Sequence, residues 1–467
     1  MTRISVTAIV MVSIARIFGV QEFGKIALAI TITSILFFVA DFGLTIYSTR
    51  EVARDNSIIG ALAATSIRIK IVSSGLTLFI AWLVTTILNY PPDTTLLIYL
   101  FSGSAIIFSF SSFFIGILRG SNRFDNEAII YFVQNVMLLL LVLLVIKLDQ
   151  SIVNIAFAFI ASKVAGLLTS LYFYYRLKGK HYFSASFLSV KDVSRKSFPF
   201  ATHALFGMIY MQADTVLLSK MSGDIEVGLY QAAMRIIIVL LYLQEIMVTA
   251  FFPSLSKLYK YSIEELIKKS KRLNFYLFIL ALPLSLSIAL IGSMIIDVVY
   301  TPEYSNAALF LQILSSLILL RFLGSTYGIL LSASDNQHLR MFSVIIAFLL
   351  NIGINSVLIP KYGAMGAATT AMITNFFMLA IYVYFIKSKL NTFLIHSSFI
   401  RVIALNLLLG LFIYSVRSAG LIFIVPTAII IYTLLTYKYI LTSSEKKNLS
   451  KMVSSIFNFF TKFEKEA

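Results

Sequence analysis

The chain has 467 residues, of which 59% are hydrophobic and only 13% are charged, and its 38 Lys and Arg against 21 Asp and Glu leave a formal net charge of +17. Soluble domains are roughly 45–50% apolar, so this composition excludes a soluble globular protein and indicates a membrane protein. The absence of cysteine excludes disulfides and thiolate metal sites. The apolar runs extend over about 18–25 residues, which suits helices that cross a hydrocarbon core of about 30 Å, whereas the strands of a barrel would alternate.

About fourteen membrane-spanning helices are predicted along the chain. The first follows a short basic start, but no small-residue cleavage site separates it from the next span, so we interpret it as a helix and not as a secretory signal. The predicted fold class is therefore an all-α polytopic membrane protein. The spans lie near residues 4–18, 26–47, 69–88, 94–118, 128–146, 152–175, 198–219, 227–250, 273–300, 306–331, 341–359, 363–386, 401–416 and 421–438.

The loops between these spans alternate in charge. One set is rich in Lys and Arg, and the other holds only Lys25, Lys147, Lys220, Lys361 and Arg417. The positive-inside rule places the basic set in the cytoplasm, and both termini fall on that side. The final residues, 441–467, are predicted to form an amphipathic helix on the membrane surface. The excess of positive charge is thus an orientation signal, and no nucleic-acid partner is predicted.

An internal repeat explains the stretch GVQEFGKI at residues 19–26. It resembles a phosphate-binding loop, but Ile26 stands where such a loop needs Ser or Thr, and the stretch lies between two predicted membrane helices. The pattern R/K-x-x-G-x-x-E-x-G occurs at Arg16–Gly24 and again at Lys220–Gly228, with a constant shift of 204 residues. We therefore interpret both stretches as copies of one turn on the outer side of the membrane.

The repeat predicts two related lobes of six spans each. An even number of spans gives both copies the same orientation, so a pseudo-two-fold axis along the membrane normal should relate them. The predicted organisation is an N-lobe at 1–175, a basic cytoplasmic linker at 176–197, a C-lobe at 198–386, two additional spans at 387–440 and a cytoplasmic tail at 441–467.

Five stretches in this order carry a resemblance to a known family: IARIFGVQEFGKIALAI, ADFGLTIYSTREVAR, GILRGSNRFDNEA, DTVLLSKMSGDIEVGLYQAAMRI and NIGINSVLIPKYGAMGAA. With them the chain resembles the oligosaccharide flippases, the Wzx-type polysaccharide and O-antigen exporters. These belong to the multidrug/oligosaccharidyl-lipid/polysaccharide (MOP) exporter superfamily. The resemblance covers the two predicted lobes, and the last two spans look like an addition found in fourteen-helix members.

The resemblance implies a V-shaped pair of helical bundles around a central cavity that opens alternately to the cytoplasm and to the outside. It also implies that the chain moves undecaprenyl-diphosphate-linked sugars across the inner membrane, beside a polysaccharide polymerase and a chain-length regulator. By the repeat, the residue that matches Phe198 would lie before Met1. We therefore expect translation to start upstream of Met1.

A diphosphate headgroup needs cations inside the membrane, where each charge costs about 2.5–3.5 kcal/mol at the centre of a helix. Arg235 and Asp214 reach matching depths on neighbouring spans, so they form either a structural salt bridge or a device in which Asp214 tunes Arg235 for phosphate. Arg321 lies deep in its span, and Lys163 either reaches the cavity or extends toward the interface. Arg16 and Lys220, at equivalent outer ends, either anchor the interface or contact the sugar diphosphate on exit.

Two carboxylates, Asp41 and Glu245, occupy equivalent positions near the cytoplasmic ends of their spans. They are candidates for coupling to H⁺ or Na⁺, or they hold loop cations such as Arg50 and Lys257. Asp297 is expected at the membrane interface. No metal-binding motif and no catalytic constellation is recognised, so the sequence predicts neither a bound cofactor nor an enzyme.

Three functions are compatible with these sequence features. The leading one is a lipid-linked oligosaccharide flippase that works by alternating access. The second is a cation-coupled multidrug exporter of the same superfamily, which would favour carboxylates over cations in its cavity. The third is a membrane glycosyltransferase or polymerase, which would need a catalytic carboxylate in a long outer loop, but the predicted outer loops are short.

Overall fold

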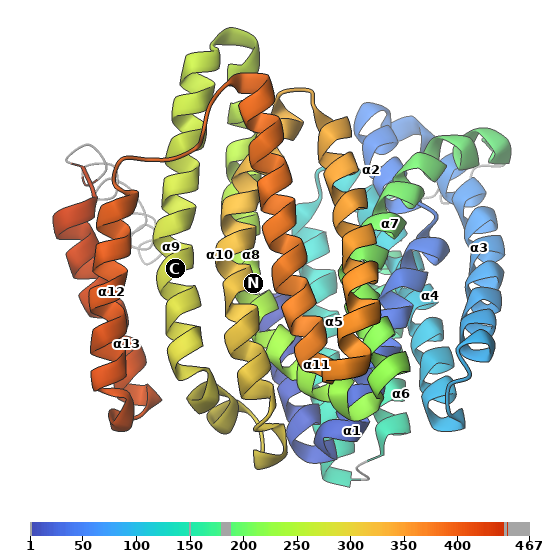
Figure 1. Cartoon of the computed structure of the whole chain (residues 1–467). Coiled ribbons are helices and arrows are strands. Elements are labelled where there is room, and N and C mark those ends of the chain that lie inside the picture. Colours follow the sequence, from blue (N-terminus) through green and yellow to red (C-terminus); the bar gives the residue numbers. More distant parts are fainter. Residues whose placement is uncertain (1, 149–150, 179–187, 443–445, 447–467) are drawn as a thin grey trace, which may run out of the picture. The chain divides into compact units, whose positions relative to one another are not determined.

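The computed structural model describes residues 2–148, 151–178, 188–442 and 446, and every regular element in these ranges is a helix (Figure 1). The α-helices are α1 (Thr2–Asp41), α2 (Leu44–Arg54), α3 (Ile59–Ile87), α4 (Pro92–Gly120), α5 (Phe124–Leu148), α6 (Ile152–Lys178), α7 (Val190–Ser222), α8 (Asp224–Tyr261), α9 (Ile263–Val299), α10 (Ala307–Ala333), α11 (Gln337–Leu390), α12 (Phe399–Ser415) and α13 (Leu421–Leu435). The short ones are the 3₁₀ turns η1 (Asn56–Ile58), η2 (Pro302–Tyr304) and η3 (Arg417–Ala419) and the π-turn η4 (Thr436–Ile440).

The helices confirm an all-α polytopic membrane protein. Ten helical stretches among the described residues are long and apolar enough to cross a membrane, and α12 is a shorter apolar helix. Two of the long helices are interrupted by glycine, α1 at Gly19 and α11 at Gly363. Helix α11 therefore contains two of the predicted spans, and α1 contains the first and most of the second. The total of fourteen spans stays a prediction.

The two copies of the repeated turn share one backbone conformation. Gly19 has φ 76° and ψ 177°, and Gly223, its counterpart at the 204-residue shift, has φ 86° and ψ 179°. Only glycine adopts this region without strain. The first glycine of the pattern is therefore needed for the reversal of chain direction between adjacent helices.

The second glycine of the pattern lets the two turns touch through their backbones. A Cβ atom added to Gly24 would lie 1.9 Å from the carbonyl oxygen of Asp224, and one added to Gly228 would lie 2.2 Å from that of Val20. Val20 and Asp224 are themselves related by the 204-residue shift. The contact is thus reciprocal, as a two-fold relation between the repeats requires.

The chain folds into two compact units, each built from segments that are separated in the sequence. The first unit comprises Met1–Val239, Val299–Phe310 and Ile346–Thr374, and the second comprises Leu240–Val298, Leu311–Ile345 and Asn375–Ala467. Helices α8, α10 and α11 thus contribute residues to both units. The lobe boundaries expected from the repeat stay a prediction. Most of the expected surface helix at 441–467, and residues 179–187 of the expected linker, lie outside the described residues.

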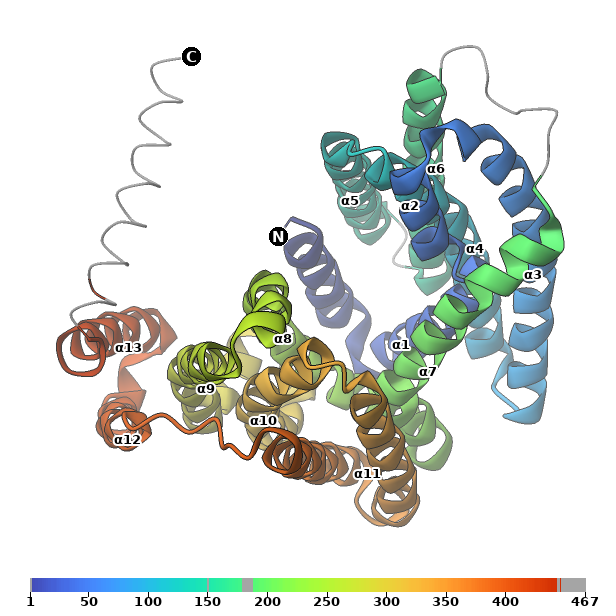
Figure 2. The ribbon, with the colours of Figure 1, turned by 90° about the horizontal axis from the view of Figure 1, so that it is seen from above.

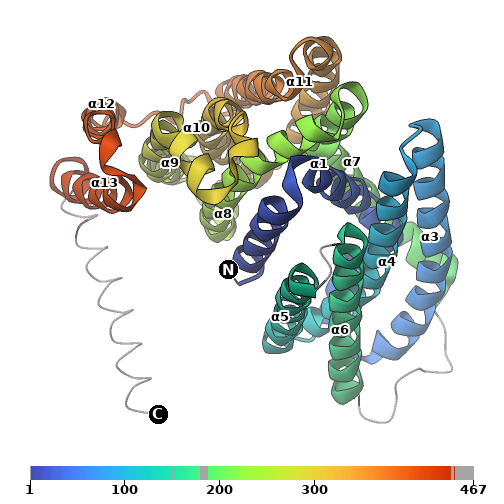
Figure 3. The ribbon, with the colours of Figure 1, turned by 90° about the horizontal axis from the view of Figure 1, so that it is seen from below.

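Within the first unit, α4 is the central helix. It lies between α3 and α6 and also packs against α1 and α2 (Figures 2 and 3). Cβ atoms added to Gly116 and Gly120 would lie 2.7 Å from the carbonyl oxygens of Thr45 and Thr49. This small-xxx-small spacing brings the backbones of α2 and α4 together.

Within the second unit, the two C-terminal helices pack against α9 (Figure 1). The ring of Phe399 at the start of α12 stacks on Phe278 with 4.2 Å between the ring centroids. Farther along the helices, Ile291 of α9 packs with Ile413 of α12 and Ile424 of α13. The last two apolar segments are therefore part of the folded second unit.

Candidate functional site

A pocket of about 230 Å³ lies in the first unit beside the end of α1. We call it the Asp41 pocket. Its walls combine five aromatic rings with one carboxylate, one guanidinium and the hydroxyl groups of Thr45, Ser112 and Tyr131, and they come from α1, α2, α4, α5 and α7. The lining residues are Phe37, Phe38, Asp41, Gly43, Thr45, Ile46, Phe108, Ser112, Ile115, Arg119, Tyr131, Phe200 and Ala204.

A tight turn creates this pocket by ending α1 at Asp41. Phe42 and Gly43 both have left-handed backbones, with φ of 52° and 72°. A Cβ atom at Gly43 would lie 2.4 Å from the carbonyl oxygen of Ser197 and 2.6 Å from the amide nitrogen of Ala201. Only glycine therefore allows α7 to approach the turn so closely, and this approach carries Phe200 into the pocket wall.

Asp41 is held by a buried lysine. The Lys70 Nζ lies 3.1 Å from Oδ1 of Asp41, and the two side chains are 0% and 5% exposed. The Thr45 hydroxyl donates to the same oxygen, and the Lys70 amine also faces the rings of Phe110 and Phe113. The partner of Asp41 is thus a residue of α3, while Arg50, the loop cation that the sequence suggested, bonds to Glu51.

Two further cations lie near Asp41: Arg119 lines the pocket, and Lys163 contacts one of the lining rings. Arg119 donates from Nε to Oε2 of Glu127 at 3.0 Å, and its second nitrogen donates to the other carboxylate oxygen, so the pair is bidentate. The Lys163 Nζ lies 4.3 Å from the centroid of the Phe108 ring, which suits a cation–π contact. Lys163, predicted to face a cavity or to extend toward the interface, thus contacts a ring that lines the Asp41 pocket.

A second polar cluster in the first unit surrounds Asp214 of α7. Its carboxylate accepts hydrogen bonds from Nδ2 of Asn351 at 2.8 Å, from Nδ2 of Asn355 at 2.7 Å and from the hydroxyl of Tyr230 at 3.2 Å. The two asparagines are one helical turn apart on α11, so both reach the same carboxylate. Pairing of Asp214 with Arg235 stays a prediction.

Arg235 lies half-buried on α8, near the loop that follows α9. Burial raises the pKa of the Tyr300 hydroxyl to about 12, and the positive charge of Arg235 opposes this shift. The same hydroxyl donates to the carbonyl oxygen of Ala232, at 3.1 Å. Arg235 is thus close enough to this buried tyrosine, which follows α9, for their charges to interact.

Arg321 occupies the middle of α10, in the second unit, and is half-buried. Its Nε donates to Oδ1 of Asn375 at 3.1 Å. An amide neutralises no charge, and within the described ranges no carboxylate forms a salt bridge with this guanidinium. Arg321 is therefore a cation of a membrane-spanning helix whose bonded partner, Asn375, is neutral.

The other residues singled out from the sequence are exposed. Arg16, Glu245 and Asp297 are exposed, and so is Lys220, whose amine donates to the carbonyl oxygen of Leu88. The structure thus places Asp41 in the wall of the pocket and Lys163 against Phe108, one of the lining rings, while Asp214 and Arg235 lie elsewhere in the first unit. Glu245 and Arg321 belong to the second unit.

Four polar residues of these sites were missed by the sequence analysis: Lys70, Arg119, Asn351 and Asn355. Lys70 seemed to lie at the start of a span, but α3 begins at Ile59, so Lys70 is inside the helix. The apolar run IGALAA at residues 59–64 was the signal that could have revealed this. The i, i+4 spacing of Asn351 and Asn355 likewise marks one polar face in an otherwise apolar segment.

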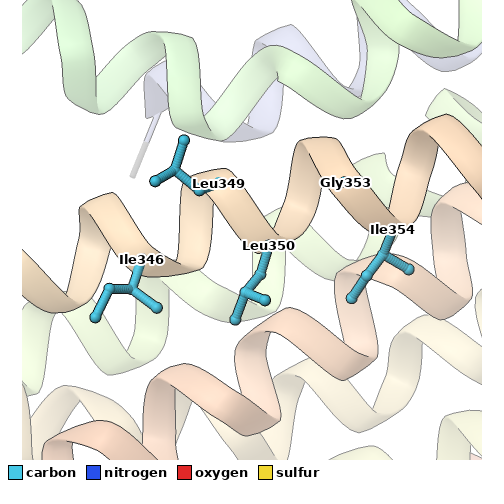
Figure 4. Close-up of a pocket in the computed structure, with 5 residues that line it drawn as sticks. All are labelled: Ile346, Leu349, Leu350, Gly353 and Ile354. Atoms are coloured by element: carbon cyan, nitrogen blue, oxygen red, sulfur yellow. The ribbon is translucent and has the colours of Figure 1, made fainter.

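A second pocket has an apolar lining. It has a volume of about 420 Å³ and lies along one face of α11, lined by Ile346, Leu349, Leu350, Gly353 and Ile354 (Figure 4). Such a lining offers no hydrogen bond, so it suits only hydrocarbon. In the described residues, no group of three or more His, Cys, Asp or Glu side chains is placed to hold a metal ion.

These features define a polytopic helical protein with an internal repeat and with charged groups inside its spans. Residues 2–259 match the family model described as polysaccharide biosynthesis protein. The chain therefore belongs to that family. The resemblance found in the sequence is thereby confirmed at the level of the family.

The chain spans about half the length of the two curated relatives that it matches. The capsular polysaccharide biosynthesis protein CapF of Staphylococcus aureus is 26% identical over 219 residues, which are 46% of this chain and 54% of the relative. An uncharacterized membrane protein of Methanocaldococcus jannaschii is 24% identical over 223 residues, which are 46% of this chain and 44% of that protein.

Solved structures show the same fold. The lipid II flippase MurJ, in an inward closed conformation, superposes with a TM-score of 0.77 at 16% identity over 93% of this chain and 96% of that chain. An inward-facing multidrug resistance MATE transporter of the MOP superfamily superposes with a TM-score of 0.72 at 15% identity, covering 84% and 94% of the two chains. The chain thus has the fold of the MOP transporters.

Proposed function

We propose that this chain is a flippase for lipid-linked oligosaccharides. It moves an undecaprenyl-diphosphate-linked glycan from the cytoplasmic to the outer face of the inner membrane by alternating access. The family, the capsular polysaccharide relative and the fold shared with a lipid II flippase support this proposal. No catalytic step is assigned to the chain, and the expected partners are membrane lipids, a polysaccharide polymerase and a chain-length regulator.

The observation that carries the proposal is the environment of Arg321. A guanidinium inside a span is unfavourable by about 2.5–3.5 kcal/mol, and its bonded neighbour Asn375 is neutral. A phosphate group supplies the missing negative charge and accepts bidentate hydrogen bonds from guanidinium. Arg321 is therefore the cation that we assign to the diphosphate. Arg235, which is half-buried in the first unit, is retained as a separate candidate.

Orientation and coupling complete the proposal. The basic loops and both termini face the cytoplasm, so the Asp41 pocket opens at the cytoplasmic side. We also propose that transport is coupled to H⁺ or Na⁺ through the carboxylate of Asp41 or Glu245. The membrane potential also contributes, because moving one charge is worth about 2.3 kcal/mol per 100 mV.

The experiment is complementation of a strain that lacks this gene. Arg321→Ala should abolish surface glycan and cause lipid-linked intermediates to accumulate on the inner leaflet, whereas Arg321→Lys should retain part of the export because it keeps the charge. The matched control is Arg417→Ala, which removes an exposed arginine outside the long spans. Normal export by an inserted, folded Arg321→Ala protein would contradict the assignment.

The drug-export alternative is favoured by one observation, the shared fold of the MATE transporter. It predicts that deletion of the gene sensitises cells to cationic dyes while surface glycan stays unchanged. That pattern would replace the flippase proposal. A membrane glycosyltransferase or polymerase would instead leave lipid-linked intermediates on the outer leaflet.

A further inference from the structure

The charges around the Asp41 pocket are balanced in pairs. Asp41 is matched by Lys70 at 3.1 Å, and Arg119 is matched by the bidentate carboxylate of Glu127. A diphosphate placed in this pocket would lie beside the carboxylate of Asp41 without an uncommitted guanidinium to offset the repulsion. The pocket therefore suits an uncharged polar group better than a phosphate.

The walls of the pocket combine flat apolar surfaces with hydrogen-bonding groups. Five aromatic rings face a space that also contains the Asp41 carboxylate and the hydroxyl groups of Thr45 and Ser112. Ser112 is buried, and it forms no hydrogen bond with another described residue. A sugar ring matches this chemistry, because its C–H faces pack on aromatic rings while its hydroxyl groups bond to carboxylate and serine oxygens.

The size and the neighbouring charge indicate which sugar would bind. The volume of about 230 Å³ is below the roughly 300–1,000 Å³ of sites for drug-sized ligands, so it suits one ring and not a chain of rings. The Lys163 amine stands over Phe108 at the wall of the pocket. Lys163 does not line the pocket, so its positive charge favours a ring whose attached diphosphate lies outside the pocket.

We propose that the Asp41 pocket is a subsite for the first sugar ring of the lipid-linked glycan, and that Asp41 and Ser112 select this ring through its hydroxyl groups. This inference rests on the flippase function proposed above. Lys70 acts as a positioning residue, because it fixes the Asp41 carboxylate from within α3. The fixed carboxylate accepts a hydrogen bond from a sugar hydroxyl group, and no covalent step is involved.

The test measures sugar recognition separately from recognition of the lipid diphosphate. Full-length protein in lipid nanodiscs is titrated with undecaprenyl diphosphate and with undecaprenyl-diphosphate-linked single sugars taken from a panel of hexoses and N-acetylhexosamines. For wild type, at least one sugar-bearing lipid should bind about tenfold more tightly than the sugarless lipid, the effect of one charge-assisted hydrogen bond.

Two variants then probe the pocket itself. Ser112→Ala should reduce the preference for that sugar by about two- to tenfold, and Ala204→Phe, which fills the pocket, should abolish the preference while binding of the sugarless lipid remains. The matched control is Ser109→Ala, at a buried serine of the same helix that does not line the pocket. It should leave the preference unchanged. Size-exclusion chromatography identifies any variant that fails to fold. If Ala204→Phe fails to fold, the result for Ser112→Ala decides the test.

The outcomes separate the inference from the proposed function. If wild type prefers a sugar-bearing lipid and folded Ser112→Ala and Ala204→Phe keep that preference, the pocket assignment is wrong while the flippase function stands. Equal binding of sugarless and sugar-bearing lipids by wild type also overturns the subsite. If wild type binds neither class of lipid, the proposed function fails and the subsite with it.

Discussion

At the scale of single residues, the buried pair of Lys70 and Asp41 shows how a charge is tolerated inside this fold. A lysine with a fully buried side chain is held by one carboxylate, one hydroxyl group bonded to that carboxylate, and two aromatic rings. Removing one partner leaves the other charge buried and uncompensated, whereas removing both charges leaves no such penalty.

We therefore expect Lys70→Met to lower the free energy of unfolding by about 3–5 kcal/mol. The double variant Lys70→Met/Asp41→Asn should recover much of this loss. The measurement is denaturation of the purified protein in detergent micelles. Lys268→Met is the matched control, because Lys268 forms an exposed pair with Glu265 and should change stability by about 0–1 kcal/mol. Equal effects at both lysines would show that the Lys70 pair contributes no more than a surface pair.

Residue types alone identified Asp41, Lys163 and Arg321, since an ionisable group in an apolar run is recognisable without a structure. They did not identify Lys70, because its position within a helix depends on where α3 begins. They also did not show that Asn351 and Asn355 reach Asp214, since these residues lie more than a hundred positions apart in the chain. Partners across helices depend on packing, which no local pattern encodes.

At the scale of elements, hydropathy located the spans but not the helix ends. The span predicted at 26–47 is divided between α1 and α2 by the turn at Phe42 and Gly43. Helix α8 continues beyond its predicted span to Tyr261, and α9 begins before its predicted span, at Ile263. A hydropathy window marks only the stretch that suits hydrocarbon, whereas a helix continues as long as its backbone hydrogen bonds are satisfied.

The repeated turn provides the prediction at this scale. Gly24→Ala and Gly228→Ala should each lower the free energy of unfolding by about 1–3 kcal/mol, because the new methyl group would overlap a carbonyl oxygen of the other repeat. The controls are Gly75→Ala and Gly103→Ala, where nothing lies within 4 Å of the added atom. These helical positions should instead gain about 0.5–1 kcal/mol. A thermal shift in detergent measures all four, and uniform behaviour would argue against the reciprocal contact.

At the scale of the whole molecule, the alternation of loop charge predicts the orientation in the membrane. The chain has no cysteine, so single cysteines can be introduced without removing others. Tyr261→Cys and Tyr362→Cys replace side chains that are 78% and 59% exposed. A thiol reagent that does not cross membranes should label Tyr362→Cys in intact cells and Tyr261→Cys only in inverted vesicles. The reverse pattern would invert the proposed direction of transport.

The sequence by itself determined that this protein is an all-α membrane protein with an internal repeat, because hydrophobic length and a repeated turn motif are properties of neighbouring residues. It also located most of the charges that lie inside the spans. Only the tertiary structure decided which of these charges are neutralised. Asp41 is neutralised by Lys70 from another helix, whereas Asp214 accepts hydrogen bonds from the neutral amides of Asn351 and Asn355. Glycines at the turns and in α4 let helix backbones approach closely. Long-range approach of this kind follows from packing in three dimensions and not from any periodicity along the chain.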